Sequence, residues 1–374
     1  MSGDHLPDIR ALNRAAIERF FSEHQNQGFH AGQVYDWLWK RACRSFHEMT
    51  NLSKLTRQLL SDHFSFHTAI PEKILKSHDG TLKVGFRLHD GLLIEGVLIP
   101  SEGRTTACIS SQVGCALGCK FCATGQLGFT RNLTTGEIFD QVVHLTSLAA
   151  TGISTPALPS SNEQMYPILS PENHLSNIVY MGMGEPFLNY EEVVESVEKI
   201  TSKEGLGMSP QRITISSIGI PKMIRKMADD KPKYHFALSL HAALDQKRDQ
   251  IIPFNLRHPL HEIVDSLKYY HSITGKRFTI EYILFGGFND SVADAKALAL
   301  FCRNFPVKIN LIEYNQVCDS GFTRADPQKT KLFIQFLSSK NLIVNLRKSR
   351  GNDIDAACGQ LAFRSGGKSD DVRK

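Results

Sequence analysis

The 374-residue sequence predicts an α/β protein whose main part is a partial barrel of six strand–helix units, a (β/α)6 arrangement. Apolar runs typical of buried strands alternate with helical patterns six times between residues 104 and 350, which favours a parallel sheet with helical crossovers. Six units in about 240 residues fit a partial barrel better than a complete eightfold one. With 41% hydrophobic and 22% charged residues, the composition excludes a disordered or fibrous chain.

Two smaller parts are expected before the barrel. Residues 1–75 show helical periodicity at 11–23, around 34–38 and at 52–64, where Thr50 is the expected cap of the third helix. Residues 76–103 hold two alternating apolar runs separated by Asp90-Gly91, a pattern that predicts a linking β-hairpin. We therefore expect a small N-terminal helical domain, joined by a hairpin to the barrel.

The barrel is expected at residues 104–350. Its six strands are predicted in ACISSQV, NIVYMGM, RITISSI, YHFALSL, RFTIEYIL and VKINLIEYN. Helices are expected between them, at residues 135–148, 190–201, 221–228, 260–273 and 291–303. Residues 151–176 are rich in Pro, Ser and Asn and predict an inserted loop, and residues 351–374 form a separate C-terminal segment.

Charge and hydropathy limit where the protein works and what it binds. The 43 Lys and Arg outnumber the 38 Asp and Glu, and the net charge of +5 permits an RNA partner without requiring one. No stretch of 18 apolar residues predicts a transmembrane helix, and the first residues lack the apolar region of a secretory leader. We expect a cytoplasmic protein without a membrane partner.

Three of the eight cysteines lie within eight residues, as Cys115, Cys119 and Cys122. Three thiolates at this spacing can converge on one metal centre, and soft sulfur ligands suit zinc or an iron–sulfur cluster. A structural zinc site usually has paired C-x₂-C knuckles, and no second pair occurs here. A closed 4Fe–4S cluster takes four cysteines, so three would leave one iron open to a substrate or cofactor. Cys43, Cys302 and Cys318 have no partner at metal spacing and are assigned to packing.

The C-x₃-C-x₂-C motif with an aromatic residue before its last cysteine resembles the radical S-adenosylmethionine (SAM) superfamily. The wider context SSQVGCALGCKFCATGQLGFTRNLT at residues 110–134 resembles one branch, the RlmN/Cfr family of RNA adenine methyltransferases. RSFHEMTNLSK at residues 44–54, NLIEYN at 310–315 and DIDAACGQL at 353–361 strengthen the likeness. The resemblance extends from about residue 29 to 361 and implies a radical SAM partial barrel.

The resemblance implies one 4Fe–4S cluster on Cys115, Cys119 and Cys122, with SAM bound to the open iron. Other residues at the strand ends would hold the rest of SAM: Gly184, Glu185, Ser216, Ser239, Leu240, His241 and Asn315. A glycine lets a ligand approach the backbone closely, and Glu185 could accept from the methionyl ammonium. Taken alone, Gly184-Glu185 is equally compatible with a strand-ending turn.

Cys358 and Cys108 are, taken alone, compatible with buried packing residues. The resemblance implies instead that a first SAM methylates Cys358. A second SAM, two per turnover, would yield a 5′-deoxyadenosyl radical that takes hydrogen from this methyl group. The resulting carbon radical would add to adenine, and Cys108 would release the adduct through a transient disulfide with Cys358. Glu95 matches the proton acceptor, a role that a raised pKa in an apolar strand would suit.

The expected activity is methylation of adenine C2 in 23S rRNA, and in tRNA next to the anticodon, by a monomer that receives electrons from a donor such as a flavodoxin system. Basic residues in the N-terminal domain, Lys40, Arg41, Arg44, Lys54 and Arg57, would help to hold RNA. Three alternatives remain. Cfr-like methylation at C8 would give antibiotic resistance, a non-catalytic iron–sulfur RNA-binding protein would need neither Cys108 nor Cys358, and a radical SAM enzyme for a small molecule would not need the basic domain.

Overall fold

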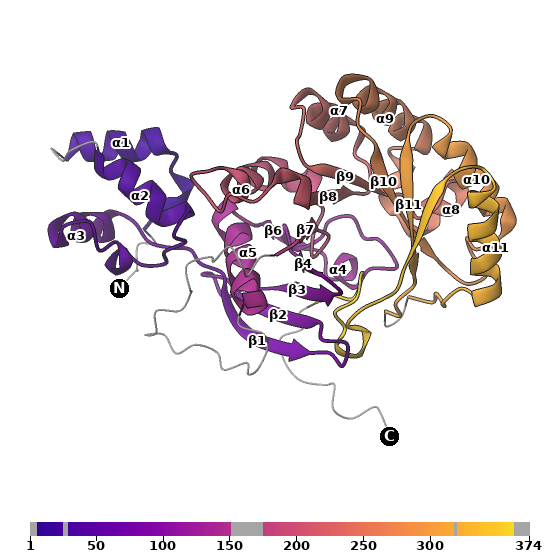
Figure 1. Ribbon diagram of the computed structural model, residues 1–374, viewed down its shortest axis with the longest axis horizontal. Helices are drawn as coiled ribbons and strands as arrows, with labels where there is room; N and C mark the ends of the chain where they lie inside the picture. Colours follow the sequence, from indigo (N-terminus) through magenta and orange to yellow (C-terminus); the bar gives the residue numbers. More distant parts are fainter. Residues whose placement is uncertain (1–5, 25–28, 151–174, 318–319, 363–374) are drawn as a thin grey trace.

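A ten-stranded mixed sheet forms the centre of the protein, which we describe from a computed structural model covering residues 6–24, 29–150, 175–317 and 320–362. The strand order is β1-β2-β3-β4-β7-β8-β9-β10-β11-β12, so neighbours in the sheet are also near neighbours in the chain. The strands from β4 to β12 pair in parallel, whereas β1 to β4 pair antiparallel. Figure 1 shows the sheet curved, with helices around its outside.

All six predicted barrel strands are present. They are β4 (Arg104–Cys108), β7 (Asn177–Tyr180), β8 (Ile213–Ser217), β9 (His235–Ser239), β10 (Phe278–Leu284) and β11 (Val307–Glu313). A seventh parallel strand, β12 (Ile343–Arg347), pairs with β11 and was not predicted. It lies at the edge of the sheet and none of its residues is buried, so it lacks the apolar run that marks the others.

The hairpin predicted around Asp90-Gly91 joins β2 (Leu82–Arg87) to β3 (Leu93–Ser101). It belongs to the main sheet, because β3 also pairs with β4. On its other side β2 pairs with β1 (Ile70–Lys76). The prediction of helical structure up to residue 75 was therefore wrong for residues 70–75. Pro71 is the second residue of this edge strand, at a register irregularity where its missing N–H costs little.

The helices follow the predicted pattern. They are α1 (Arg14–Glu23), α2 (Phe29–Trp39), α3 (Lys54–His63), α4 (Ala123–Gln126), α5 (Thr135–Ala150), α6 (Tyr190–Thr201), α7 (Pro221–Asp229), α8 (Asp245–Ile251), α9 (Leu260–Thr274), α10 (Val292–Cys302) and α11 (Pro327–Ser338). The residue that caps α3 is Ser53 and not the expected Thr50, because the Ser53 side chain accepts from the Thr56 N–H. Helices α4, α8 and α11 were not predicted. The inserted loop lies almost entirely outside the described residues.

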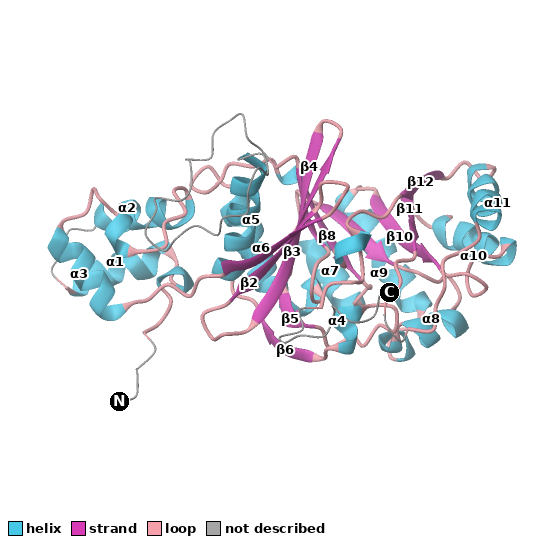
Figure 2. Ribbon diagram, turned by 90° about the horizontal axis from the view of Figure 1, so that it is seen from below, coloured by secondary structure: helices cyan, strands magenta, loops and turns pink. Residues whose placement is uncertain are grey.

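The three N-terminal helices stand at one end of the molecule, and α10 and α11 stand at the other (Figure 2). A buried arginine, Arg10, joins the N-terminal helical unit to the barrel. Its guanidinium donates to Asp140 Oδ1 on α5 at 2.8 Å, to the Gly136 carbonyl and to the His67 carbonyl. A Cβ at Gly136 would lie 2.8 Å from this guanidinium, so glycine allows the close approach. No described helix is long and apolar enough to cross a membrane.

The chain after β12 runs back across the open side of the partial barrel towards β1–β3, as the yellow segment of Figure 1 shows. Gly351 N–H donates to Asp79 Oδ2 at 3.0 Å, and Asp353 accepts from Ser77 Oγ at 2.5 Å. Lys83 on β2 donates to the Asp355 carbonyl. Because Ser77 and Asp79 lie in the β1–β2 turn, these bonds connect the two ends of the sheet and place the C-terminal segment over the barrel interior.

Candidate active site

The cysteine loop lies between a short strand, β5 (Gln112–Gly114), and helix α4, where Cys122 is the N-terminal flanking residue. β5 pairs with β6 (Phe129–Asn132) in a separate two-stranded sheet. Backbone bonds fix the loop, because Cys115 N–H donates to the Gly128 carbonyl and Lys120 N–H donates to the Ile251 carbonyl. Phe121 packs against His241 and Phe285 at the ends of other strands.

The three loop cysteines are suited to a metal cluster. Burial raises the pKa of Cys115 to about 12, and burial together with the two neighbouring thiols raises that of Cys119 well above its usual range. Such thiols are neutral at pH 7, and thiolates must form as a metal binds. In the described ranges no three His, Cys, Asp or Glu side chains already surround a common metal position. The donors are nonetheless soft and close in sequence, and Cys115 and Cys119 are buried while Cys122 is half-buried, which suits an iron–sulfur cluster.

Glu185 lies in the segment that follows β7, where it caps the short 3-10 helix Pro186–Asn189. Its carboxylate oxygens accept from Phe187 N–H at 3.0 Å and from Ile218 N–H at 3.1 Å. Burial raises the pKa of Glu185 to about 7, although hydrogen bonds to the carboxylate act in the opposite direction. The space beside Gly184 is filled by Gln112, since a Cβ at Gly184 would lie 2.6 Å from the Gln112 side chain. The glycine is therefore needed for packing against Gln112, a contact that the sequence did not indicate.

The predicted residues of β8 and β9 meet at the strand ends. Ser216 Oγ and Ser239 Oγ are 2.9 Å apart. His241 has a positive φ of 57° and accepts from the Ile283 N–H through Nδ1. Burial, with a further contribution from Arg248, lowers the pKa of His241 to about 3, so the ring is neutral.

Arg248 supports these strand ends and was not found from the sequence. Its guanidinium is fully buried and donates to the carbonyls of Leu240 and Ile218 and to Asn255 Oδ1. The Leu240 carbonyl accepts from Arg248, and the Leu240 N–H donates to the Glu281 carbonyl. The Leu240 backbone is therefore held in place from both sides.

Asn315 and Cys358 come together although 43 positions separate them. The Asn315 amide donates to the Cys358 carbonyl at 3.3 Å, while Asn315 Oδ1 is buried without a hydrogen-bond partner. The loop that carries Cys358 is bound to the cysteine loop, because Ala123 N–H donates to the Gly359 carbonyl at 2.7 Å and Thr124 Oγ1 donates to the Leu361 carbonyl at 2.6 Å.

Cys108 and Cys358 line one cavity of about 130 Å³, which also has Cys122, Asn315 and Arg347 in its walls. Both thiols are free, and each faces the Arg347 guanidinium. Burial raises the pKa of Cys108 to about 12 and also raises that of Cys358, whereas Arg347 lowers both. Cys358 nevertheless keeps an exposed surface. Cys108 and Cys358 are far apart in the sequence, but in the fold they share a cavity with the loop cysteine Cys122.

Glu95 does not line this cavity but lies close to it on β3. Cys108 pairs with Val97, and because side chains alternate along a strand, Glu95 is on the same face of the sheet. Lys83 Nζ lies 2.8 Å from Glu95 Oε1, and both side chains are largely buried. Burial raises the pKa of Glu95 and the Lys83 ammonium opposes this shift.

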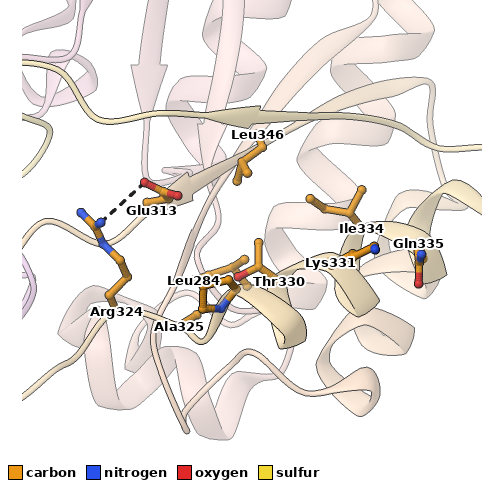
Figure 3. Close-up of a pocket in the computed structure, with 10 residues that line it drawn as sticks. Leu284, Glu313, Arg324, Ala325, Thr330, Lys331, Ile334, Gln335 and Leu346 are labelled. Atoms are coloured by element: carbon orange, nitrogen blue, oxygen red, sulfur yellow. Dashed lines mark ion pairs between the residues drawn. The ribbon is translucent and has the colours of Figure 1, made fainter.

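A larger pocket of about 480 Å³ lies elsewhere, between α11 and the ends of β10, β11 and β12 (Figure 3). Glu313 and Arg324 form an ion pair at its edge, and Ile334 and Leu346 contribute apolar surface. It contains none of the predicted site residues, so size alone does not identify the site here. The remaining cysteines fit the packing prediction where they are described: Cys43 and Cys302 are buried, and Cys318 lies outside the described residues.

Two family models match the chain. The ribosomal RNA large subunit methyltransferase N-terminal domain matches residues 8–65, and the radical SAM superfamily matches residues 109–299. The second range contains the cysteine loop and the predicted strand-end residues other than Asn315. By fold and by sequence, the chain is a radical SAM protein, and this family implies a 4Fe–4S cluster and SAM.

Curated relatives define the branch. A protein of Christiangramia forsetii, named as a probable dual-specificity RNA methyltransferase RlmN, is 48% identical over 97% of this chain and 98% of its own. The dual-specificity RNA methyltransferase RlmN of Desulfotalea psychrophila is 39% identical over 95% and 94%. The crystal structure of a radical SAM methyltransferase from Sphaerobacter thermophilus has a TM-score of 0.85 and 36% identity, covering 95% of this chain and 99% of that one. The chain therefore belongs to the RlmN family of radical SAM RNA methyltransferases, and the Cfr-like alternative is not favoured.

Proposed function

We propose that this protein methylates C2 of an adenine in 23S rRNA, and of the tRNA adenine next to the anticodon, through a methyl group carried on Cys358. The observation that supports this proposal most is the cavity shared by Cys108, Cys358 and the loop cysteine Cys122. A binding protein or a packing role would require neither the shared cavity nor two free thiols in it.

Adenine C2 is electron-poor and carries no acidic proton, so polar methyl transfer from SAM is unsuitable there. Cysteines 115, 119 and 122 would hold the cluster, and SAM would be held by Gly184, Glu185, Ser216, Ser239, Leu240, His241 and Asn315. When bound, the cluster and SAM supply the radical that activates the Cys358 methyl group, with two SAM consumed per turnover. Asn315 offers an acceptor without a partner, and Glu185 would accept from the ammonium group of SAM.

The protein's own residues act before and after the new carbon–carbon bond forms. Cys358 is fixed beside the cysteine loop by the Gly359 and Leu361 carbonyls, so a methyl group on its sulfur would be carried to a defined position. Glu95 would accept the proton lost from the adenine ring, and Lys83 holds its carboxylate at 2.8 Å. Cys108 would then lose its thiol proton and attack the Cys358 sulfur, so that a disulfide forms as the carbon–sulfur bond to the product breaks and the released carbon takes up a proton to complete the methyl group. We further propose that the enzyme works as a monomer supplied with electrons by a flavodoxin-type donor.

Two single substitutions test this sequence of steps. Cys358→Ala should abolish RNA methylation while the cluster remains, because no sulfur carries the methyl group. Cys108→Ala should instead accumulate a covalent protein–RNA adduct that survives denaturing gels and is destroyed by nuclease. Cys302→Ala, in another buried cysteine outside the cavity, is the matched control and should methylate normally.

Mass spectrometry of the modified nucleoside gives the methylated carbon. Methylation at C8 would contradict the proposed position, and methylation by Cys358→Ala would contradict the proposed carrier.

A further inference from the structure

A run of cations borders the cysteine cavity: Arg347, Lys348 and Arg350 all lie in its wall. Arg347 is the last residue of β12, the strand at the open edge of the sheet, and Lys348 and Arg350 lie in the chain directly after it. Arg347 is turned inward, where its guanidinium lies 3.4 Å from the buried Glu281 and faces both thiols. Lys348 and Arg350 are exposed.

Both ends of this segment are fixed. Arg347 pairs with Ile312 in the sheet, and Gly351 donates its N–H to Asp79. Gly351 has a positive φ of 66°, and a Cβ there would lie 2.8 Å from the Thr81 side chain. Lys348 and Arg350 are therefore carried by a short segment held across the open side of the barrel, at the cavity that contains Cys358.

The two exposed cations are not neutralised by close ion pairs. Among the described residues, neither Lys348 nor Arg350 has a carboxylate within 4.0 Å. The nearby acids have other partners, since Asp79 accepts from Gly351 and Thr81, and Asp353 accepts from Ser77 and His78. A positive segment at the mouth of a cavity attracts an anion, and a nucleic acid strand offers one phosphate per nucleotide.

We propose that Lys348 and Arg350 bind two phosphates of the RNA strand whose adenine enters the cavity, with Arg347 as the innermost cation of the same site. This inference rests on the proposed function and adds the contacts that position the substrate. Because phosphate contacts carry no sequence information, this site orients the strand, and the cavity selects the base. An adenine must leave its stack to reach the cavity, and fixed contacts to its flanking phosphates hold the strand in that arrangement.

The test uses full-length enzyme with its cluster and a 23S rRNA fragment that contains the target adenine. Lys348→Ala/Arg350→Ala should weaken binding roughly tenfold at low salt and reduce the slope of log affinity against log salt by about 1.4, or about 0.7 per lost contact to a single strand. The loss should be the same for a fragment in which guanine replaces the target adenine. Lys348→Arg/Arg350→Lys should restore both the affinity and the slope.

Lys296→Ala/Arg303→Ala is the control, because it removes two exposed charges on and just after α10, on the outside of the barrel. It should bind like the native enzyme, and the cluster absorbance of every variant should match the native value. If Lys348→Ala/Arg350→Ala keeps the native affinity and slope while the native enzyme methylates the fragment, the phosphate site is refuted and the proposed function stands. If the native enzyme neither binds nor methylates the fragment, the proposed function itself fails.

Discussion

Two buried polar regions of this molecule differ in how fully their groups are paired. Where the N-terminal helical unit meets α5, the terminal nitrogens of Arg10 have oxygen partners in Asp140 and in two backbone carbonyls, and its Nε, which forms no hydrogen bond, still lies 3.6 Å from the Asp8 carboxylate. In the cysteine cavity, Asn315 Oδ1 has no partner, and burial raises the pKa of the Cys108 and Cys358 thiols. Burying a polar group without a partner costs free energy. The first region is therefore a structural joint, and the second retains groups that a ligand can satisfy.

The largest effect should come from removing one cluster ligand. Cys119→Ala should leave anaerobically reconstituted protein without the brown colour and the broad absorbance at about 400 nm expected of cysteine-ligated iron–sulfur sites, and without SAM cleavage. Cys43→Ala, a buried cysteine of the N-terminal unit, should keep both. A colourless native protein that binds one zinc ion per chain would contradict the cluster assignment.

Breaking the structural joint should lower stability without touching the chemistry. Arg10→Met leaves Asp140 and Asp8 buried without their cation, which should reduce the free energy of unfolding by about 3–5 kcal/mol. Arg14→Met removes an arginine whose ion pairs with Glu18 and Glu204 are half exposed, and should change stability by less than about 1 kcal/mol. Anaerobic denaturant titration measures both values. Equal effects of the two substitutions would show that the buried pairing is unimportant.

The sequence predicted the parts of the fold whose pattern is local. The six parallel strands are buried apolar runs, and the Asp90-Gly91 turn carries its own conformational signal. The pattern failed at β12, an exposed edge strand, and at β1, which follows a helical unit directly. Neither strand is buried on a whole face, so neither shows the period on which the prediction depended.

The site was predicted unevenly for a similar reason. The cysteine loop is visible in eight consecutive residues, whereas linking Cys108 to Cys358 depended on a family resemblance. Arg248, Lys83 and Arg347 were missed because their partners lie on other elements, and charged residues in a sequence are usually exposed. Only the fold shows that these three are buried or turned inward.

The smallest effect concerns pH and a histidine at the structural joint. His144 on α5 is buried, and burial followed by the nearby Arg44 lowers its pKa well below the usual value. The unfolded chain binds a proton near pH 6.5 and the folded chain does not, so stability should fall as pH decreases below about 6.5, by at most about 1.4 kcal/mol per pH unit. Burial and Arg248 lower the pKa of His241 to about 3, so His241 contributes a second decline in stability of the same sign.

His144→Gln should therefore make the decline in stability between pH 6.5 and 5 shallower without removing it. His261→Gln, at an exposed position on α9, should leave the decline unchanged. Unfolding free energies measured across this range decide the matter: a decline as steep in His144→Gln as in the native protein would mean that the acid sensitivity arises away from the joint, in the barrel interior.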